Sequence, residues 1–210
     1  MKFISFRRYY LDKYLSGASF HGKILDIGGK KEQKRGSFRP PMEKVVSWEY
    51  LNIDTSTNPD YSCSVEDIPV EDKHFDMIVL TEVLEHLENP PAALKECFRI
   101  LQDNGTMIAT MPFLYPLHAD PCDFQRWLPE KINKEFGDAG FKVCKLIPMG
   151  GIIAVLFDIL NVYVNSKRVN FLFKFIRKLS ILLSPLLLKL DAKIQLKDKI
   201  NTGFYIEAKK

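Results

Sequence analysis

One short segment, residues 112–127 (PFLYPLHADPCDFQRW), concentrates side chains that can do acid–base and binding chemistry. They are a candidate base, acids, a cation and an aromatic ring: His118, Asp120, Asp123, Arg126 and Tyr115. An imidazole or a carboxylate can take up a hydroxyl proton, so we predict catalytic roles for His118 and Asp120. The other three residues are predicted to bind a polar acceptor. The alternative is a structural loop, in which Asp123 pairs with Arg126 and the aromatic residues close the core.

A second set of candidates consists of glycines and acids near the ends of short apolar runs. They are Asp26, Gly28 and Gly29 in residues 23–29 (KILDIGG), and Asp54 at the end of residues 50–54 (YLNID). Such runs are typical of buried parallel strands, and open parallel sheets bind ligands at the carboxyl ends of their strands. Glycine allows close approach of the backbone to a ligand. Each feature alone also fits a tight turn or a solvated strand end, so the prediction depends on their order and spacing.

Two carboxylates in this set suggest a nucleoside-containing ligand. Asp54 can accept hydrogen bonds from both hydroxyls of a ribose. Asp67, in the stretch Glu66-Asp67-Ile68-Pro69, can accept a hydrogen bond from an adenine amino group. A nicotinamide-dependent oxidoreductase is a weaker alternative, because Lys30, Lys31 and Glu32 follow Gly29 where the dinucleotide pattern G-x-G-x-x-G requires another glycine.

The distribution of cysteine and histidine argues against a metal site. The chain has four cysteines without a CxxC pair, and four histidines. We therefore predict no bound metal, reduced thiols and a cytoplasmic location. The formal net charge of +4 is too small to indicate a nucleic-acid partner. The basic and aromatic N-terminus lacks the apolar stretch of a signal peptide, and no apolar run is long enough to cross a membrane.

The predicted elements alternate between strands and helices. Strands are expected at residues 23–29, 50–54, 75–81, 106–112, 141–147 and 203–208. Pro90 and Pro129 each open a predicted helix. This alternation predicts an α/β domain with a mainly parallel sheet. We expect a single domain over 1–210, with a core at about 20–150 plus 200–210 and a helical insertion at about 151–199.

The central part of the chain resembles the class I S-adenosylmethionine-dependent methyltransferases, specifically the type 11 methyltransferase-domain group. The stretch VEDIPVEDKHFDMIVLTEVLEHLENP, continuing through ALKECFRILQDNGTMIATMPF, carries the resemblance. It implies a Rossmann-like sheet with helices on both faces and an antiparallel last strand. It also implies S-adenosylmethionine as cofactor, bound by Asp26, Gly28, Gly29, Asp54, Asp67 and Glu82.

The resemblance implies in-line transfer of a methyl group, for which alignment of donor and acceptor matters most. The pattern from Pro112 to Arg126 is similar to relatives that act in bacterial surface glycan synthesis. We therefore expect a small-molecule or glycan-type acceptor, methylated at oxygen. The pair Glu85-His86 is interpreted either as part of the cofactor pocket or as catalytic. A non-catalytic or partner-dependent S-adenosylmethionine-binding subunit is the alternative function.

Residues 165–200 are both basic and apolar. Nine Lys and Arg residues against two Asp give a net charge of +7, interleaved with Phe and Leu. Pro185 divides the segment, so two short helices are expected. The segment either packs as a lid or a homodimer surface, or lies on the inner face of a membrane as a basic amphipathic element.

Overall fold

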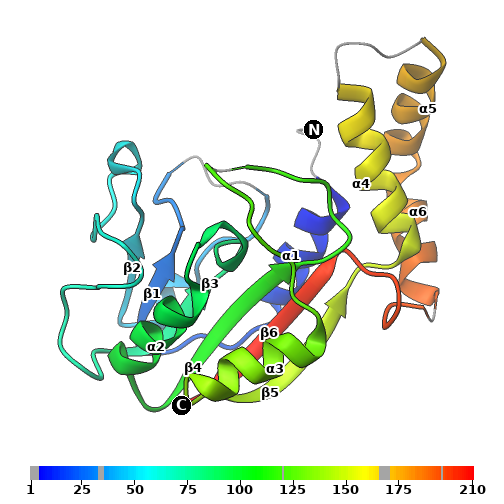
Figure 1. The fold of residues 1–210 in the computed structure, drawn as a ribbon. Coiled ribbons are helices and arrows are strands. Elements are labelled where there is room, and N and C mark those ends of the chain that lie inside the picture. The colour runs from blue at the N-terminus through cyan, green and yellow to red at the C-terminus, as the bar shows by residue number, and fades with distance from the viewer. Residues whose placement is uncertain (1–4, 33–35, 120, 166–170, 195) are drawn as a thin grey trace.

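The computed structural model describes residues 5–32, 36–119, 121–165, 171–194 and 196–210. Its centre is a six-stranded sheet with the order β2-β1-β3-β4-β6-β5 (Figure 1). The strands are β1 (Lys23–Ile27), β2 (Ser47–Leu51), β3 (Phe75–Leu80), β4 (Leu101–Pro112), β5 (Lys142–Met149) and β6 (Gly203–Lys209). Strands β1 to β4 pair in parallel, and β6 is antiparallel to both β4 and β5. The predicted fold class is confirmed, including the reversed last strand.

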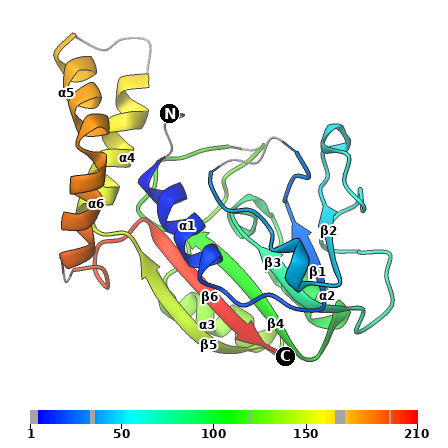
Figure 2. The ribbon, with the colours of Figure 1, turned by 180° about the vertical axis from the view of Figure 1, so that it is seen from behind.

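Each strand divides its apolar side chains between two cores, because neighbouring residues of a strand point to opposite faces. In β3, Ile78 and Leu80 face one core, whereas Met77 and Val79 face the other. The first core is covered by α2 (Pro90–Ile100) and α3 (Pro129–Asp138), and the second by α1 (Phe6–Ser16) and part of α4 (Ile152–Asn165). Figure 2 shows α1 lying across the back of the sheet. Helices therefore cover both faces, as predicted.

Helix α1 was not foreseen from the sequence. Ser5 caps it by accepting a hydrogen bond from the Arg8 backbone N–H at 3.1 Å. Phe6, Tyr10 and Leu11 are buried against the sheet. The polar residues Arg7 and Asp12 are buried as well, and they interrupt the apolar stripe by which an amphipathic helix is normally recognised. This helix matters for the site because it brings Arg7 to the carboxyl end of β3.

The second strand lies earlier than predicted. It was expected at residues 50–54 and is found at Ser47–Leu51. Trp48 and Tyr50 alternate into the core, so the strand is defined by buried aromatic residues rather than by the apolar run further on. Asp54 consequently lies beyond the strand, where it caps the short 3₁₀ helix Thr55–Thr57.

The insertion before the last strand consists of α4, α5 (Phe171–Leu182) and α6 (Ser184–Lys193), which stand together beyond the β5 side of the sheet (Figure 1). We call these three helices the helical arm. Pro185 lies at the start of α6, so the predicted break into two short helices is confirmed. Among the helices of the described residues, none is long and apolar enough to cross a membrane.

Two buried carboxylates attach the helical arm to α1. Asp158 of α4 accepts hydrogen bonds from the backbone N–H groups of Phe6 and Arg7, at 2.8 and 2.9 Å. Asp191 of α6 accepts a 2.6 Å hydrogen bond from the Tyr10 hydroxyl and bonds from the start of α4. Because buried carboxylates are costly to leave unpaired, these bonds hold the base of the arm on α1.

Candidate functional site

The glycine turn after β1 is tightly packed against the segment that follows β3. Gly28 has φ +79°, and a Cβ added to it would lie 2.6 Å from a methyl carbon of Val83. A Cβ on Gly29 would lie 2.5 Å from the carboxyl carbon of Asp26. The Asn52 amide donates to the carbonyl oxygens of both glycines, at 3.3 and 3.0 Å. The turn thus places main-chain atoms that carry no side chain at the carboxyl edge of the sheet. This is the edge at which such sheets bind ligands.

Asp26 and Asp54 have different surroundings at this edge. Asp26 accepts a 3.1 Å hydrogen bond from the indole N–H of Trp48. Asp54 is exposed, and its Oδ1 accepts bonds from the Ser56 backbone N–H and hydroxyl at 3.0 and 2.6 Å. These bonds lower the pKa of Asp54 below its ordinary value. An ionised, exposed carboxylate at this position has the chemistry that recognition of ribose hydroxyls requires.

The structure does not bring Asp67 to the glycine turn. The adjacent Ile68 is bonded to the second half of α2: its N–H donates to Glu96 at 2.8 Å and its carbonyl accepts from Arg99 at 3.0 Å. Since α2 runs back from the carboxyl edge, Asp67 lies toward the opposite edge, beside a shallow depression that includes His74. Its predicted contact with adenine therefore gains no support from this placement.

Glu82 forms an ion pair with the buried Arg7 that was not predicted from the sequence, and its own side chain is 23% exposed. Its carboxylate accepts two hydrogen bonds from Arg7 of α1, one of them at 2.6 Å from Nε, and a third at 2.8 Å from the Thr110 hydroxyl. Burial raises the pKa of Glu82, but the charge and hydrogen bonds of Arg7 outweigh it and hold that pKa below its usual value. Glu82 also has φ +57°, a costly conformation for a residue with a side chain. Any contact of Glu82 with the cofactor stays a prediction.

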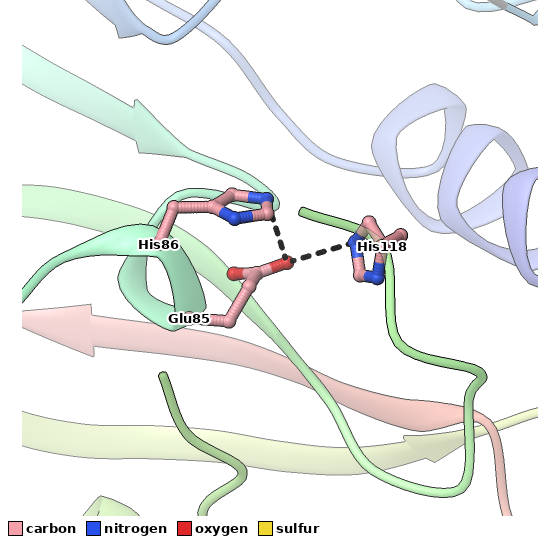
Figure 3. A group of neighbouring side chains, drawn as sticks. All are labelled: Glu85, His86 and His118. Carbon is pink, nitrogen blue, oxygen red and sulfur yellow. Dashed lines mark ion pairs between the residues drawn. The ribbon is translucent and has the colours of Figure 1, made fainter. Parts of the chain in front are cut away.

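Next to this ion pair lies a cluster of Glu85, His86 and His118 (Figure 3). The first two come from the 3₁₀ turn Leu84–His86 after β3, and His118 comes from the loop after β4. Oε1 of Glu85 is 3.7 Å from Nε2 of His118 and 3.9 Å from Nε2 of His86. This cluster was not predicted from the sequence, because the two segments are far apart along the chain.

Glu85 is an unusual carboxyl group for its position. It is 0% exposed, and within the described residues neither of its oxygens has a hydrogen-bond partner. Burial and then the negative charge of Glu82 raise the pKa of Glu85 to about 8. Burial lowers the pKa of His118 below its ordinary value. An unbonded carboxyl group beside imidazoles of this kind is characteristic of sites that move protons or bind cations.

The loop carrying His118 is ordered by its own charged residues. Asp123 accepts a 3.0 Å hydrogen bond from the His118 backbone N–H and a two-point contact from Arg126. The Arg126 hydrogen bond lowers the pKa of Asp123 to about 2. These contacts match the structural alternative for this pair, so acceptor binding by Asp123 and Arg126 stays a prediction. Trp127 is buried, as that alternative requires, but Phe124 is exposed.

Tyr115 and Asp120 complete the predicted acceptor loop. The Tyr115 ring packs edge-on against His118, with ring centroids 5.2 Å apart. The Arg7 guanidinium lies 5.4 Å from the centre of the same ring. Tyr115 therefore links the imidazole to the ion pair, and it stays a candidate for acceptor binding. Asp120 lies outside the described residues, so its catalytic role stays a prediction.

The structure adds Arg7 to the residues predicted from sequence. It also brings Glu85, which the sequence paired with His86 as part of the cofactor pocket or as catalytic, next to His118. Arg7 had no signal in the sequence, because it reaches Glu82 only when α1 folds across the sheet. Together, the tight glycine turn, exposed Asp54 and a polar cluster at the same sheet edge fit a nucleoside-containing methyl donor on one side and a polar acceptor on the other.

A Rossmann-like sheet whose β6 is antiparallel, with a site at its carboxyl edge, is the architecture of the class I S-adenosylmethionine-dependent methyltransferases. Comparison with protein families agrees: residues 3–145 match a family described as "Methyltransferase domain", which is more than half of the chain. The chain belongs to this methyltransferase family. Its fold is the one found in proteins described as S-adenosylmethionine-dependent methyltransferases.

More distant similarities place the fold among known structures. The ubiquinone/menaquinone biosynthesis C-methyltransferase UbiE of Xylella fastidiosa (strain M23) is 28% identical over 124 residues, 44% of this chain and 49% of the relative. The chain thus spans about half the length of the curated relatives it matches. A S-adenosylmethionine-dependent methyltransferase from Archaeoglobus fulgidus superposes with a TM-score of 0.58 at 15% identity, covering 97% of this chain and 92% of that chain.

The [4+2]-cyclase SpnF superposes almost as well. Its TM-score is 0.57 at 14% identity, covering 95% of this chain and 80% of that chain. At such identities the likeness concerns the fold alone. A cyclase and a methyltransferase among the structural neighbours show that this fold does not by itself determine the reaction.

Proposed function

We propose that the chain transfers the methyl group of S-adenosylmethionine to a hydroxyl oxygen of a small-molecule or glycan-type acceptor held against residues 112–127. In this step the acceptor oxygen forms a bond to the methyl carbon. The carbon–sulfur bond breaks with its electron pair remaining on sulfur, which leaves S-adenosylhomocysteine. The hydroxyl proton passes to the cluster of Glu85 and His118, where His118 is the predicted acceptor.

The observation that carries this proposal is the polar character of the cluster beside the glycine turn. His118 is partly exposed, its side chain 33% accessible, whereas Glu85 behind it is fully buried. Nδ1 of His118 lies 3.2 Å from the Pro116 carbonyl oxygen. A carbonyl oxygen only accepts, so Nδ1 carries the hydrogen and Nε2 is the basic atom. A positioned base of this kind is useful for a hydroxyl acceptor, whose proton must leave during transfer.

On the donor side, S-adenosylmethionine supplies an activated methyl group. Gly28 and Gly29 provide the close backbone approach, and Asp54 provides a carboxylate for the ribose hydroxyls. Asp26 lies beneath the turn, where its bond to Trp48 fixes its side chain. These residues bind and orient the donor, and alignment of donor and acceptor is the main requirement of an in-line displacement.

The test is a methyl-transfer assay with an acceptor panel. Purified protein is incubated with isotopically labelled S-adenosylmethionine and with hydroxyl-bearing sugars, sugar nucleotides, small alcohols and quinol-type aromatics. We expect the label in an O-methyl group, identified by NMR of the product. Transfer to carbon, as the name of the UbiE relative describes for that protein, would contradict the oxygen assignment. Binding of S-adenosylhomocysteine without any transfer would favour the non-catalytic or partner-dependent alternative.

We further propose that the helical arm contacts an anionic membrane surface. It exposes large apolar side chains: Leu156, Tyr163, Phe171, Leu172, Phe175 and Leu182. Exposed lysines lie on the same helices at positions 178, 189 and 193. Apolar and basic side chains together match the acyl boundary and the anionic headgroups of a membrane. The base of the arm is held by α1, so its outer faces are available for such a contact.

Liposome co-sedimentation tests the membrane contact. Binding should rise with the fraction of anionic lipid and fall with salt. Each lysine near an anionic surface contributes about 1 kcal/mol, so Lys178→Glu with Lys189→Glu should weaken binding about tenfold or more. The matched control, Lys95→Glu with Lys142→Glu, makes the same charge change away from the arm. Absence of liposome binding together with concentration-dependent dimerisation would show that the arm is a dimer surface instead.

A further inference from the structure

The cluster at the carboxyl edge presents three potential metal-binding atoms to one another. One carboxylate oxygen and one nitrogen from each imidazole lie within 4.8 Å of each other (Figure 3). We propose that Glu85, His86 and His118 bind one divalent first-row transition-metal ion. Two imidazoles and one carboxylate are a ligand set found in catalytic zinc sites and in non-haem iron sites.

The orientation of both imidazoles is fixed by backbone carbonyl groups. Nδ1 of His86 lies 2.5 Å from the Cys122 carbonyl oxygen, and Nδ1 of His118 lies 3.2 Å from that of Pro116. Each Nδ1 must therefore carry a hydrogen, which leaves the lone pair on Nε2. Metal-binding histidines are characteristically held in this way, with the second ring nitrogen donating to a carbonyl or carboxylate. Both Nε2 atoms face the same oxygen of Glu85.

The charges around the cluster leave one carboxylate without a counter-ion. Arg7 is paired with Glu82, and Arg126 is paired with Asp123. Glu85 is fully buried, and neither oxygen accepts a hydrogen bond within the part of the chain that the structure describes. Both Nε2 atoms face one oxygen of Glu85 at 3.7 and 3.9 Å, too far for a hydrogen bond. A cation bound between the three groups supplies a partner for that buried oxygen and for both imidazole lone pairs.

Binding one ion requires the three ligand atoms to move closer together. Bonds of about 2.0–2.2 Å in a tetrahedral site put neighbouring ligand atoms roughly 3.4 Å apart. The two distances from Glu85 are 3.7 and 3.9 Å, and all three ligand atoms lie within 4.8 Å of one another, so each pair must close by at most about 1.4 Å. Those shifts fall on the turn Leu84–His86 and on the loop carrying His118, neither of which is part of the sheet.

Three protein ligands leave coordination positions open for a substrate oxygen. This part of the inference rests on the proposed function: an acceptor hydroxyl bound to the ion is acidified by it. His118 then serves as a ligand that positions the ion, rather than as a free base. The two roles of His118 are distinguishable, because a ligand is needed for metal binding in the absence of any acceptor, whereas a free base is not.

Metal binding is measured directly on the full chain. The protein is treated with a chelator, dialysed, and titrated with Zn²⁺ by calorimetry and with Co²⁺ by visible absorption. We expect one ion per chain. Loss of an outer-sphere partner of a metal site weakens binding about 10- to 100-fold, so Glu85→Gln, His86→Ala and His118→Ala should each weaken it by at least that factor. His21→Ala, which removes an exposed histidine elsewhere, is the matched control. Circular dichroism checks that each variant is folded.

The possible outcomes separate this site from the proposed function. No saturable binding of either ion to wild-type protein would overturn the metal site, as would binding that Glu85→Gln and His86→Ala leave unchanged. Hydroxyl methylation that resists the chelator but is lost in His118→Ala would also overturn it, with His118 acting as a free base. Stoichiometric metal binding without hydroxyl methylation would support the metal site and contradict the proposed acceptor.

Discussion

The two halves of the site are built in different ways. The donor half uses the glycine turn after β1 and an exposed carboxylate, Asp54, held by neighbouring residues of its own loop. The acceptor half uses side chains from α1, from the end of β3 and from the loop after β4, joined by the ion pair of buried Arg7 with partly exposed Glu82. The donor half is formed by the backbone conformation of short, contiguous segments. The acceptor half is formed by charged groups from distant segments that pack together in the folded protein.

This difference has a thermodynamic consequence. Removing an exposed carboxylate from the donor half costs only the contacts it makes with a ligand. Removing one member of a partly buried ion pair leaves the other charge without a partner, which is destabilising. Substitutions in the donor half should therefore change cofactor affinity at nearly constant stability. Substitutions in the acceptor half should change turnover or stability, with little direct effect on the cofactor.

The largest effect is expected on turnover, from His118→Ala. Whether as a base or as a metal ligand, His118 acts on the acceptor hydroxyl, and a positioned base contributes about 10²- to 10⁴-fold. Steady-state methyl transfer should fall by such a factor, while S-adenosylhomocysteine affinity measured by calorimetry stays nearly unchanged. A variant that instead loses cofactor binding would place His118 in the wall of the donor half.

A large effect on stability is expected from Arg7→Met. This change leaves Glu82, whose side chain is 23% exposed, without its cation, which should lower the free energy of unfolding by about 1–3 kcal/mol. Chemical denaturation measures it, and Lys13→Met, an exposed basic residue of the same helix, is the control. Adding Glu82→Gln to Arg7→Met should recover part of the loss. If the double variant is less stable than Arg7→Met alone, the ion pair is not the cause.

An effect of similar size, on affinity, is expected from Asp54→Ala. Ribose hydroxyls left unpaired cost on the order of 1–3 kcal/mol, which is roughly 5- to 150-fold in the dissociation constant of S-adenosylhomocysteine. Asp67→Ala is the matched comparison, because Asp67 is also an exposed acid but lies away from the glycine turn. We expect that variant to bind within about twofold of wild type. Equal losses of S-adenosylhomocysteine affinity in both variants would support the predicted contact of Asp67 with adenine.

The last effect concerns the pH dependence of stability at Asp158, which caps α1 from the helical arm. Burial raises the pKa of Asp158 to about 6, above its ordinary value of 3.8. The folded protein therefore binds this proton more tightly than the unfolded chain does. The associated stability is fully present below pH 3.8 and is lost as the pH rises to about 6.

Asp158→Asn removes this titrating group but keeps an oxygen that can accept from α1. Between about pH 4 and pH 6, the unfolding free energy of the wild type should therefore fall relative to that of the variant. Denaturant titrations at several pH values measure this difference. A difference that does not change with pH would mean that Asp158 stays ionised in the folded protein.

The sequence predicted those parts of the molecule that depend on local patterns. Apolar runs located most strands, paired prolines located the start of α2, and Pro185 located the break in the helical arm. The Gly28-Gly29 turn was recognisable because its strand and turn are contiguous. The strand β2 was misplaced because its burial comes from Trp48 and Tyr50 rather than from an unbroken apolar run.

The acceptor half could not be assembled from local patterns. Arg7 reaches Glu82 only because α1 folds across the sheet, and Glu85 meets His118 only because the loop after β4 returns over the end of β3. Neither contact has a fixed spacing in the chain. Burial of Asp158 and Asp191 is equally invisible in the sequence, since both lie in helices whose partner, α1, was not predicted.

The central claim is that the carboxyl edge of this sheet binds S-adenosylmethionine through the Gly28-Gly29 turn. The most direct measurement is calorimetric titration of the wild type and of Gly28→Val with S-adenosylhomocysteine and, separately, with NAD. We predict that one S-adenosylhomocysteine binds per wild-type chain and that NAD binding is not measurable. Gly28→Val should lose S-adenosylhomocysteine binding, because its side chain would collide with Val83. Binding of NAD in place of S-adenosylhomocysteine, or full affinity in Gly28→Val, would contradict it.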